Sequence, residues 1–411
     1  MAQSFYELIE YLKASEESSS KEFYECQVNK YNKAHETDNN KVPSNNNFVI
    51  FELLILQKLL KHERSVIMEY LQTSYHGLML RNPLIAGSCG LTNSISDIKE
   101  LALRGVGAVV IKSLFEEQIN VETENVIISE EGEVKTFTRA PDKLFGKRIY
   151  DYDEAYSYIF DFAKKNTLEK YLDFLKEAKR SVDIPVIASI NCVSNQNWHA
   201  FAKKIQDTKV DGLELNIYIL PSDWRRSGED NERIYFDIIR EVKNYVDMPL
   251  SVKIGYYFSS LAQSVQKLSE SGIKGLVLFN RPYNTDFNID KIGLSHGSVF
   301  SSNEEYTHTL RWISILSGHV KCDLSASTGV HDYKAFIKQL LAGATTVQIA
   351  SALYKKGFDV IPEILKGTVE WMRKHEFESI DSFRGKLSQS NLENPAAIER
   401  VQFMKLYSGI E

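Results

Sequence analysis

Cysteine is scarce in this chain, and its spacing excludes several kinds of site. There are only four cysteines in 411 residues (Cys26, Cys89, Cys192 and Cys322), and no two of them form a Cys-x-x-Cys pair. Neither a zinc site, an iron–sulfur cluster nor a disulfide framework can be built on that spacing. We therefore expect no structural metal, and a reducing compartment, the cytoplasm, suits the chain best.

The chain also has no long hydrophobic run. Its first apolar stretch, Phe48–Leu60, contains Glu52 and is shorter than the roughly 20 residues that a bilayer span needs. It begins too far along the chain to be a secretory signal. We expect no integral membrane span, and the stretch is either a helix packed on the main domain or a short membrane-associating helix.

An excess of positive charge is missing as well. Lysine and arginine number 49 and aspartate and glutamate 55, so the formal net charge is 49 − 55 = −6. This balance argues against a nucleic-acid partner and leaves a small-molecule substrate as the expectation. With 43% hydrophobic residues, the chain can bury one large core or two ordinary ones.

Residues 1–66 differ in composition from the rest. The segment Asn29–Asn47 is rich in Asn and Lys and has almost no apolar residues, which indicates a solvated linker. We expect a poorly ordered or helical extension over 1–66 and one folded domain over 67–411. That domain opens with a predicted hairpin whose turn is His76-Gly77.

From Pro83 onward, short apolar runs alternate with helical patterns. Such alternation predicts a parallel sheet, and eight strand–helix units are the number that closes a TIM (β/α)8 barrel, with a doubly wound open sheet as the competing arrangement. The predicted strands are Leu84–Gly87, Gly107–Lys112, Pro185–Ile190, Gly212–Ile217, Leu250–Ile254, Gly275–Phe279, Cys322–Ser325 and Thr345–Ile349. A long insertion follows the second strand, between Ser113 and Asn166, with a hairpin expected at Glu130-Glu131-Gly132; insertions of this length are typical of lids or subdomains.

Polar and small residues recur where the predicted strands end, which is where barrels place their ligands. They are Gly87, Ser88, Lys112, Ser113, Asn191, Asn216, Lys253, Asn280, Thr328, Gly329, Ala350 and Ser351. Lys112 and Lys253 end apolar strands, so each needs an anion, a flavin or a carbonyl as partner. The asparagines favour a flavin, since amides match its donor and acceptor edges; a Schiff-base lysine is the rival. The turns after the last two strands suit a phosphate.

Taken together, these stretches resemble class 1 dihydroorotate dehydrogenases and the related dihydropyrimidine dehydrogenase barrel. The resemblance covers roughly Tyr70 to Leu387 and is carried by Asn82–Ser88, Val109–Ser113, Pro185–Asn191, Leu213–Ile217, Val252–Ile254, Leu340–Ile349 and Phe383–Leu387. It implies an FMN cofactor whose ring and ribityl chain contact Gly87, Ser88, Lys112, Ser113, Asn191, Asn216 and Lys253. Thr328, Gly329, Ala350 and Ser351 would then hold the phosphate. It also implies a homodimer, and it allows a separate electron-transfer partner.

One loop departs from the family pattern. The family usually follows the Asn of its fourth strand with Ser-Cys-Pro-Asn, whose Cys removes a proton from dihydroorotate. Here the sequence continues from Asn216 as Ile-Tyr-Ile-Leu-Pro-Ser, so Ile219 replaces the base and Ser222 is the nearest hydroxyl. Tyr218 and Asp223 are weaker candidates.

The sequence thus predicts an FMN-dependent oxidation of a CH–CH bond, by default that of dihydroorotate to orotate in pyrimidine biosynthesis, with Ser222 and Lys253 as catalytic residues. A different cyclic amide or enone substrate, a lysine-dependent lyase and a catalytically silent flavin-binding barrel are the alternatives.

Overall fold

The computed structural model describes residues 70–115, 168–192, 198–282 and 285–399. Contacts divide the chain into two units, Met1–Tyr70 and Leu71–Glu411, and only the second is described below. The apolar stretch Phe48–Leu60 and the hairpin expected at Glu130–Gly132 lie outside the described residues, so the domain boundary near residue 66 stays a prediction. Within the described parts, no helix is long and apolar enough to cross a membrane.

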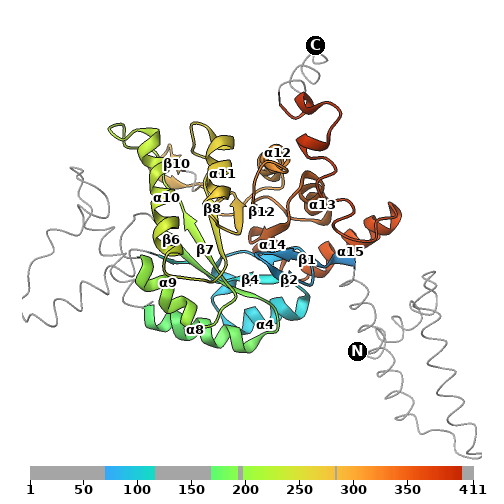
Figure 1. Ribbon diagram of the computed structural model, residues 1–411, viewed down its shortest axis with the longest axis horizontal. Helices are drawn as coiled ribbons and strands as arrows, with labels where there is room; N and C mark the ends of the chain where they lie inside the picture. The colour runs from blue at the N-terminus through green and yellow to red at the C-terminus, as the bar shows by residue number, and fades with distance from the viewer. Residues whose placement is uncertain (1–69, 116–167, 193–197, 283–284, 400–411) are drawn as a thin grey trace, which may run out of the picture. The chain divides into compact units, whose positions relative to one another are not determined.

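The core is a closed barrel of parallel strands (Figure 1). Each strand pairs with its neighbours in the order β4-β3-β13-β12-β9-β8-β7-β6, and β4 also pairs with β6, which closes the ring. The strands are β3 (Leu84–Ala86), β4 (Ala108–Val110), β6 (Val186–Cys192), β7 (Gly212–Ile217), β8 (Leu250–Ile254), β9 (Gly275–Leu278), β12 (Asp323–Ser327) and β13 (Thr346–Ile349). A short β5 (Leu114–Phe115) also pairs with β6. The TIM-barrel prediction is confirmed, and the open sheet is wrong.

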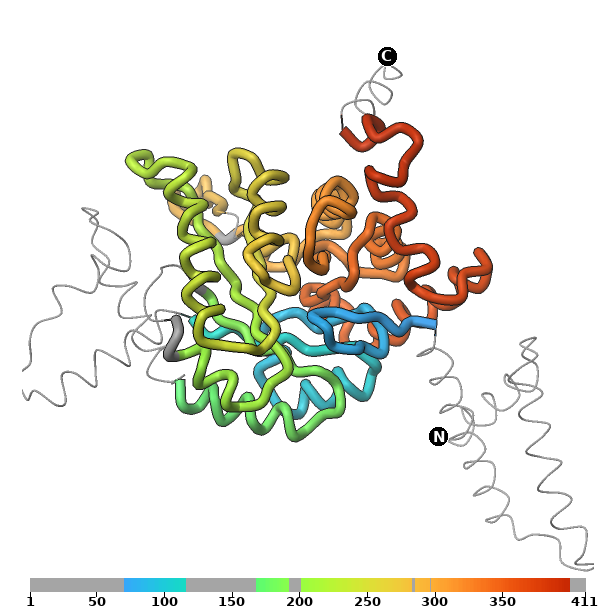
Figure 2. Tube along the Cα trace, viewed as in Figure 1, coloured from blue at the N-terminus to red at the C-terminus, as the bar shows by residue number. Residues whose placement is uncertain are grey.

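Helices surround the barrel (Figure 2), and their apolar faces cover it. They are α4 (Ile95–Arg104), α8 (Leu168–Ser181), α9 (Trp198–Asp207), α10 (Gly228–Lys243), α11 (Leu261–Glu270), α12 (Tyr306–Leu316), α13 (Tyr333–Ala342), α14 (Ser351–Lys356) and α15 (Val360–Lys374). Single-turn 3-10 helices lie at Gly90–Thr92, Gln389–Asn391 and Pro395–Ala397. Helix α10 begins earlier than its apolar pattern indicates because the Ser227 side chain caps it, accepting from the Asp230 N–H at 3.0 Å.

The predicted N-terminal hairpin is present and closes one end of the barrel. Strands β1 (Thr73–Tyr75) and β2 (Leu78–Leu80) are joined by His76 and Gly77, both with positive φ. The Tyr75 and His76 rings stack with centroids 4.0 Å apart, and both side chains are buried. A Cβ on Gly275, the first residue of β9, would come within 2.8 Å of His76 Nε2, so the glycine makes room for the hairpin.

A second hairpin was not predicted. Strands β10 (Thr285–Asn288) and β11 (Gly293–His296) pair antiparallel between β9 and α12. Its large apolar side chains are exposed, and Phe287 and Leu294 keep 69% and 80% of their surface in solvent. Because these residues bury nothing, their pattern carries no signal of a half-buried strand.

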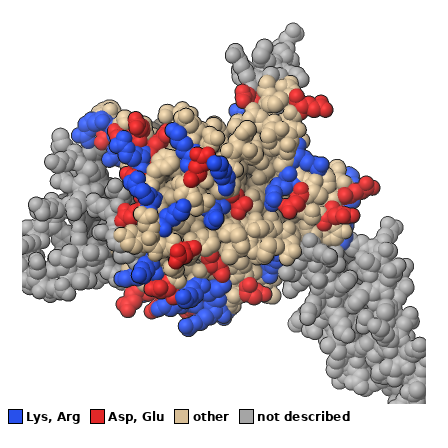
Figure 3. Space-filling view, in the orientation of Figure 1, with Lys and Arg blue, Asp and Glu red and all other residues tan. Residues whose placement is uncertain are grey.

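Charged side chains of both signs are distributed over the outside of the barrel. On the face in Figure 3, lysines and arginines lie among aspartates and glutamates. Several form short-range ion pairs, such as Arg233 with Glu229 and Asp230 on α10. On this face, neither sign of charge forms a continuous patch.

Candidate active site

The polar strand ends predicted from the sequence meet at the C-terminal end of the barrel. Asn191, Asn216 and Lys253 are direct neighbours in the strand register of β6, β7 and β8. Asn280, just beyond β9, donates from Nδ2 to Asn216 Oδ1 at 2.9 Å. Three amides and one ammonium group therefore line one arc of the barrel mouth.

Lys253 is largely buried and is held by a contact that the sequence did not reveal. Its side chain is 9% exposed, and Nζ donates to Gln348 Oε1 at 3.3 Å. Gln348 in turn donates from Nε2 to Glu214 Oε2 at 2.6 Å. Burial raises the pKa of Glu214, an effect that the Lys253 charge and the Gln348 hydrogen bond partly offset.

Glu214 and Gln348 were missed because each lies inside an apolar strand. The two-residue repeat of a β-strand could have identified Glu214. It precedes Asn216 by two residues, so both side chains point to the same side of β7. The interior face of β7 therefore continues below the predicted site. A carboxylate in that position needs a partner within the barrel, and Gln348 provides it.

Three serine hydroxyls contact one another in the neighbouring part of the barrel mouth. Ser88 Oγ lies 3.0 Å from Ser113 Oγ and accepts from the Ser113 N–H at 2.9 Å. Ser113 Oγ lies 2.8 Å from Ser189 Oγ, a residue that was not predicted. The structure thus brings Ser88 and Ser113 together as expected, beside Gly87, whose N–H donates to Ile349 O at 2.9 Å. Lys112 is half-buried, and its N–H contacts Thr92 O at 3.4 Å.

The turn predicted to hold a phosphate has two residues with positive φ and an unexpected neighbour. Thr328 and Gly329 have φ values of 80° and 78°, and Thr328 Oγ1 donates to Phe279 O at 3.2 Å. Ser301 accepts from the Gly329 N–H at 3.3 Å and donates from its own N–H to Ser351 Oγ at 3.0 Å. Ser301 therefore ties the turn after β12 to Ser351, the residue after Ala350 and the first of α14.

His331 completes this corner. Its side chain is 1% exposed, and Nε2 lies 3.0 Å from Ser301 Oγ. Burial lowers the pKa of His331, as do Lys355 and Lys356. Both lysines donate to backbone carbonyls here, Lys355 to Ser301 O at 2.7 Å and Lys356 to His331 O at 2.9 Å. The corner thus gathers two cations and a hydroxyl beside the predicted phosphate turn.

The loop after β7 places the predicted base at the surface. Ser222 is exposed in a turn in which its N–H donates to Leu220 O at 2.8 Å. Asp223 is held by Arg225 through Oδ1 and Oδ2, at 3.0 and 3.1 Å. Of the three candidates, Tyr218 is the one that packs on another strand end, since a Cβ on Gly255 would lie 3.2 Å from its ring.

Tyr218 belongs to an aromatic cluster that sequence analysis did not identify. Its ring meets Tyr257 edge-on with centroids 6.1 Å apart, and Tyr256 contacts Tyr257, Phe279 and His308. Burial and the neighbouring Tyr257 raise the pKa of Tyr218. The phenol therefore keeps its proton at neutral pH, and it can donate one.

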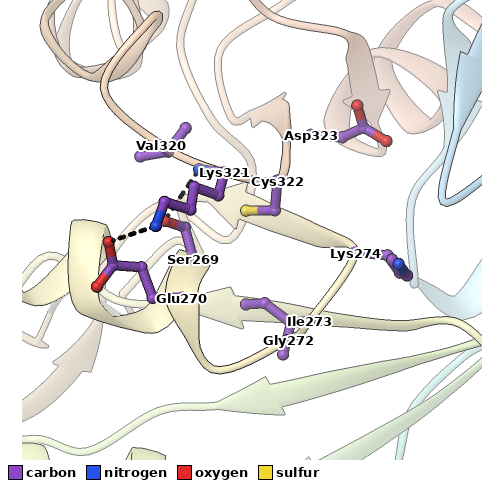
Figure 4. Close-up of a pocket in the computed structure, with 9 residues that line it drawn as sticks. All are labelled: Ser269, Glu270, Gly272, Ile273, Lys274, Val320, Lys321, Cys322 and Asp323. Carbon is purple, nitrogen blue, oxygen red and sulfur yellow. Dashed lines mark hydrogen bonds and ion pairs between the residues drawn. The ribbon is translucent and has the colours of Figure 1, made fainter.

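A surface depression lies at the opposite end of the barrel (Figure 4). It is lined by residues at the start of β9 and β12, including Lys274, Cys322 and Asp323, and by the Lys321–Glu270 ion pair at 3.2 Å. In parallel barrels the reacting groups lie at the other strand ends, so we assign this depression no catalytic role. The described ranges contain no group of three His, Cys, Asp or Glu side chains that would hold a metal ion.

A closed parallel barrel with a buried lysine and several amides at its C-terminal mouth defines the class of (β/α)8-barrel enzymes. A model of the dihydroorotate dehydrogenase family matches residues 163–372, which span β6 to β13, so the chain belongs to this family and is an oxidoreductase of that type. This membership sets aside the lysine-dependent lyase.

Several relatives agree with this assignment. The chain is 23% identical over 329 residues to the dihydroorotate dehydrogenase B (NAD(+)) catalytic subunit of Thermoplasma volcanium, covering 77% of this chain and 98% of the relative. It is 25% identical over 217 residues to a putative dihydroorotate dehydrogenase A (fumarate) of Aeropyrum pernix, covering 51% and 70% of the two chains. The chain is also 29% identical over 202 residues to the dihydroorotate dehydrogenase B (NAD(+)) catalytic subunit of Saccharolobus solfataricus, covering 48% of this chain and 68% of the relative.

Proposed function

We propose that this chain is an FMN-dependent dehydrogenase that oxidises the CH–CH bond of a dihydropyrimidine, with dihydroorotate as substrate and orotate as product. The observation that carries the proposal is the buried Lys253 ammonium beside the Asn216–Asn280 amide pair at the barrel mouth. On this proposal the reaction is a step of pyrimidine biosynthesis.

The donor set at the mouth fits a flavin ring. The pyrimidine edge of an isoalloxazine alternates hydrogen-bond acceptors with one donor, and Asn191, Asn216 and Asn280 carry both kinds of group. Lys253 has three N–H donors, of which Gln348 takes one. Its charge would stabilise the negative charge that the reduced ring acquires.

The remaining predicted residues would hold the rest of the cofactor. Gly87, Ser88, Lys112 and Ser113 would contact the ring and ribityl chain. Thr328, Gly329, Ala350 and Ser351 would hold the phosphate, together with Ser301, whose hydroxyl already contacts the Gly329 N–H. The positive charges of Lys355 and Lys356 beside this corner favour an anion there.

When bound, FMN supplies the acceptor for a hydride from the substrate, and the chain must remove the adjacent proton. We propose Ser222 as the group that takes this proton, because it is the nearest serine to the position where Ile219 replaces the usual base. A serine does this only when a neighbouring group relieves it of its own proton. In the turn after β7, the Asp223 carboxylate is the adjacent group in sequence, and Arg225 contacts both of its oxygens.

A second function is favoured by Tyr218. A half-buried phenol carries a proton at neutral pH, and a proton is what the reduction of a C=C bond needs on the carbon that does not receive hydride. The alternative is therefore an FMN barrel that acts on another cyclic amide or an enone, with Tyr218 delivering the proton.

The partners of the reaction follow from the same proposal. We infer a homodimer from the family resemblance, and a separate electron-transfer protein because two of the relatives are named catalytic subunits. Size-exclusion chromatography with light scattering tests for the homodimer. Copurification of a flavin- or cluster-bearing protein from the native host tests for the electron-transfer partner.

The deciding experiment is the anaerobic visible spectrum of the purified protein before and after dihydroorotate is added. A flavin spectrum that bleaches supports both the cofactor and the substrate. A flavin spectrum that persists with dihydroorotate but bleaches with another cyclic amide, or that returns when an enone is added after reduction with dithionite, favours the second function. A flavin that no donor or acceptor changes indicates a silent barrel, and a protein that stays colourless when supplied with FMN rejects the proposal.

A further inference from the structure

Three buried polar side chains form a chain of contacts inside the barrel. Glu214 comes from β7, Lys253 from β8 and Gln348 from β13, and they are 1%, 9% and 2% exposed. Strands β12 and β9 stand between β13 and β8 in the sheet, so Gln348 reaches Lys253 across the interior and not along a shared edge. The contact is therefore a feature of the closed barrel.

Hydrogen-bond chemistry gives this chain of contacts a direction. A lysine ammonium only donates, so the amide oxygen of Gln348 must face Lys253, at 3.3 Å. The amide nitrogen then faces Glu214 and donates to its Oε2 at 2.6 Å. The positive end of the amide dipole points at the carboxylate and the negative end at the ammonium.

Glu214 is too deep to touch a ligand itself. It precedes Asn216, the residue at the mouth, by two positions on the same side of β7. A lone ammonium in a dry interior is costly, and the usual response is the loss of its proton. A carboxylate one amide away offsets that cost, and the Lys253 charge is among the influences on the pKa of Glu214.

We propose that Glu214 is a positioning residue that acts through Gln348 to hold the Lys253 side chain in place at the barrel mouth. This inference rests on the proposed function, in which the flavin ring lies against Lys253. In that setting, Glu214 controls how strongly the site stabilises the reduced flavin, without contacting it.

The test uses charge relocation. Glu214→Gln removes the negative charge, and the double variant Glu214→Gln with Gln348→Glu restores it one residue closer to Lys253, with the donor and acceptor of the Glu214–Gln348 contact exchanged. Thr346→Val is the matched control, because Thr346 is another buried polar side chain of β13 but pairs with Ser325 at 2.9 Å and lies outside the chain of contacts. The readouts are the Kd for FMN and the midpoint potential of the bound flavin, with Lys253→Met as reference.

We expect Glu214→Gln to bind FMN about tenfold or more weakly and to shift the midpoint potential to more negative values, in the same direction as Lys253→Met. The double variant should return both quantities toward those of the unchanged protein, and Thr346→Val should leave them unchanged.

An unchanged or more positive potential in Glu214→Gln would overturn the inference, because Lys253 would then act on the flavin independently of Glu214. If the single variant fails to fold, as judged by circular dichroism, the double variant decides by whether its potential matches the unchanged protein. If Lys253→Met shifts the midpoint potential and Glu214→Gln does not, this inference is rejected and the proposed function is not. If the unchanged protein binds no FMN, the proposed function is rejected and this inference with it.

Discussion

The main-chain N–H of His76 donates to Asp323 Oδ2 at 3.0 Å, which ties the tip of the N-terminal hairpin to the first residue of β12. The hairpin and the strand are far apart in the sequence, so this contact forms only in the folded barrel. It fixes the Tyr75–His76 stack against the N-terminal end of the barrel, where the two rings exclude water.

The burial of His76 makes stability depend on pH. Burial lowers the pKa of His76 to about 3, whereas the unfolded chain has an ordinary histidine near 6.5. Between these values the unfolded state binds more protons, so stability is present above pH 6.5 and is lost as the pH falls, by at most about 1.4 kcal/mol per pH unit. His76→Asn keeps a side chain that tolerates positive φ and should flatten the acid limb.

Urea denaturation of both proteins from pH 7 to pH 4 measures this effect. Subtracting one profile from the other removes the contributions of shared carboxyl groups such as Asp323. Parallel profiles would show that His76 does not stay neutral in the folded protein.

A methyl group at Gly275 should loosen the hairpin. The Cβ of Gly275→Ala would lie 2.8 Å from His76 Nε2 and 3.0 Å from Tyr75 OH, inside a tightly packed region. We expect a loss of roughly 1–3 kcal/mol in the free energy of unfolding, measured by urea denaturation. Gly228→Ala is the control, since its Cβ would meet Ser259 Oγ at an ordinary 3.6 Å. Equal stability of the two variants would contradict the close packing of the hairpin.

We expect the predicted phosphate site to require the glycine at position 329. In Gly329→Ala the new Cβ would come within 2.1 Å of the Tyr306 nitrogen, and φ is 78°. Gly77→Ala is a matched control, because φ is 77° there but nothing lies within 4 Å. We expect Gly77→Ala to cost roughly 1–2 kcal/mol from backbone strain alone.

Gly329→Ala should cost more, and on the proposed function it should also abolish FMN retention during gel filtration. Retention of FMN by Gly329→Ala would place the phosphate elsewhere. A loss of FMN by Gly77→Ala would show that the assay reports global instability.

The identity of the proton-transferring group separates the two proposed functions. If Ser222 takes the proton of dihydroorotate, Ser222→Ala should slow anaerobic flavin reduction by about a hundredfold or more, and Tyr218→Phe should have little effect. If Tyr218 delivers a proton to an enone, Tyr218→Phe should instead slow the reoxidation of dithionite-reduced flavin by the enone, and Ser222→Ala should have little effect on it. Stopped-flow absorbance with each substrate measures both rates. Equal small effects in both variants would exclude both residues.

Much of the fold followed from the sequence because burial leaves a periodic signal. The strands from β3 to β13 that form the barrel are apolar runs between helical patterns, and each was predicted within a few residues. The hairpin β10–β11 gave no such signal, because Phe287 and Leu294 are exposed. Its pairing depends on the turn and on backbone hydrogen bonds, neither of which a hydrophobic pattern records.

The candidate site was predicted only where it coincides with strand ends. Asn216, Lys253 and Asn280 follow apolar runs, so position alone identifies them. Ser301 and His331 come from irregular segments whose placement depends on tertiary contacts. Glu214 looked like an ordinary strand residue, and only the closed barrel shows that Gln348 faces it.

The packing of the N-terminal hairpin has a consequence for solvent access to the barrel interior. With Tyr75 and His76 packed into one end, the buried side chains of Glu214 and Gln348 are linked by hydrogen bonds to Lys253 at the other end. On the proposed function, a ligand seated against Lys253 would cover that end of the chain of contacts. Glu214 would then be shielded from solvent on both sides for as long as the ligand stays bound.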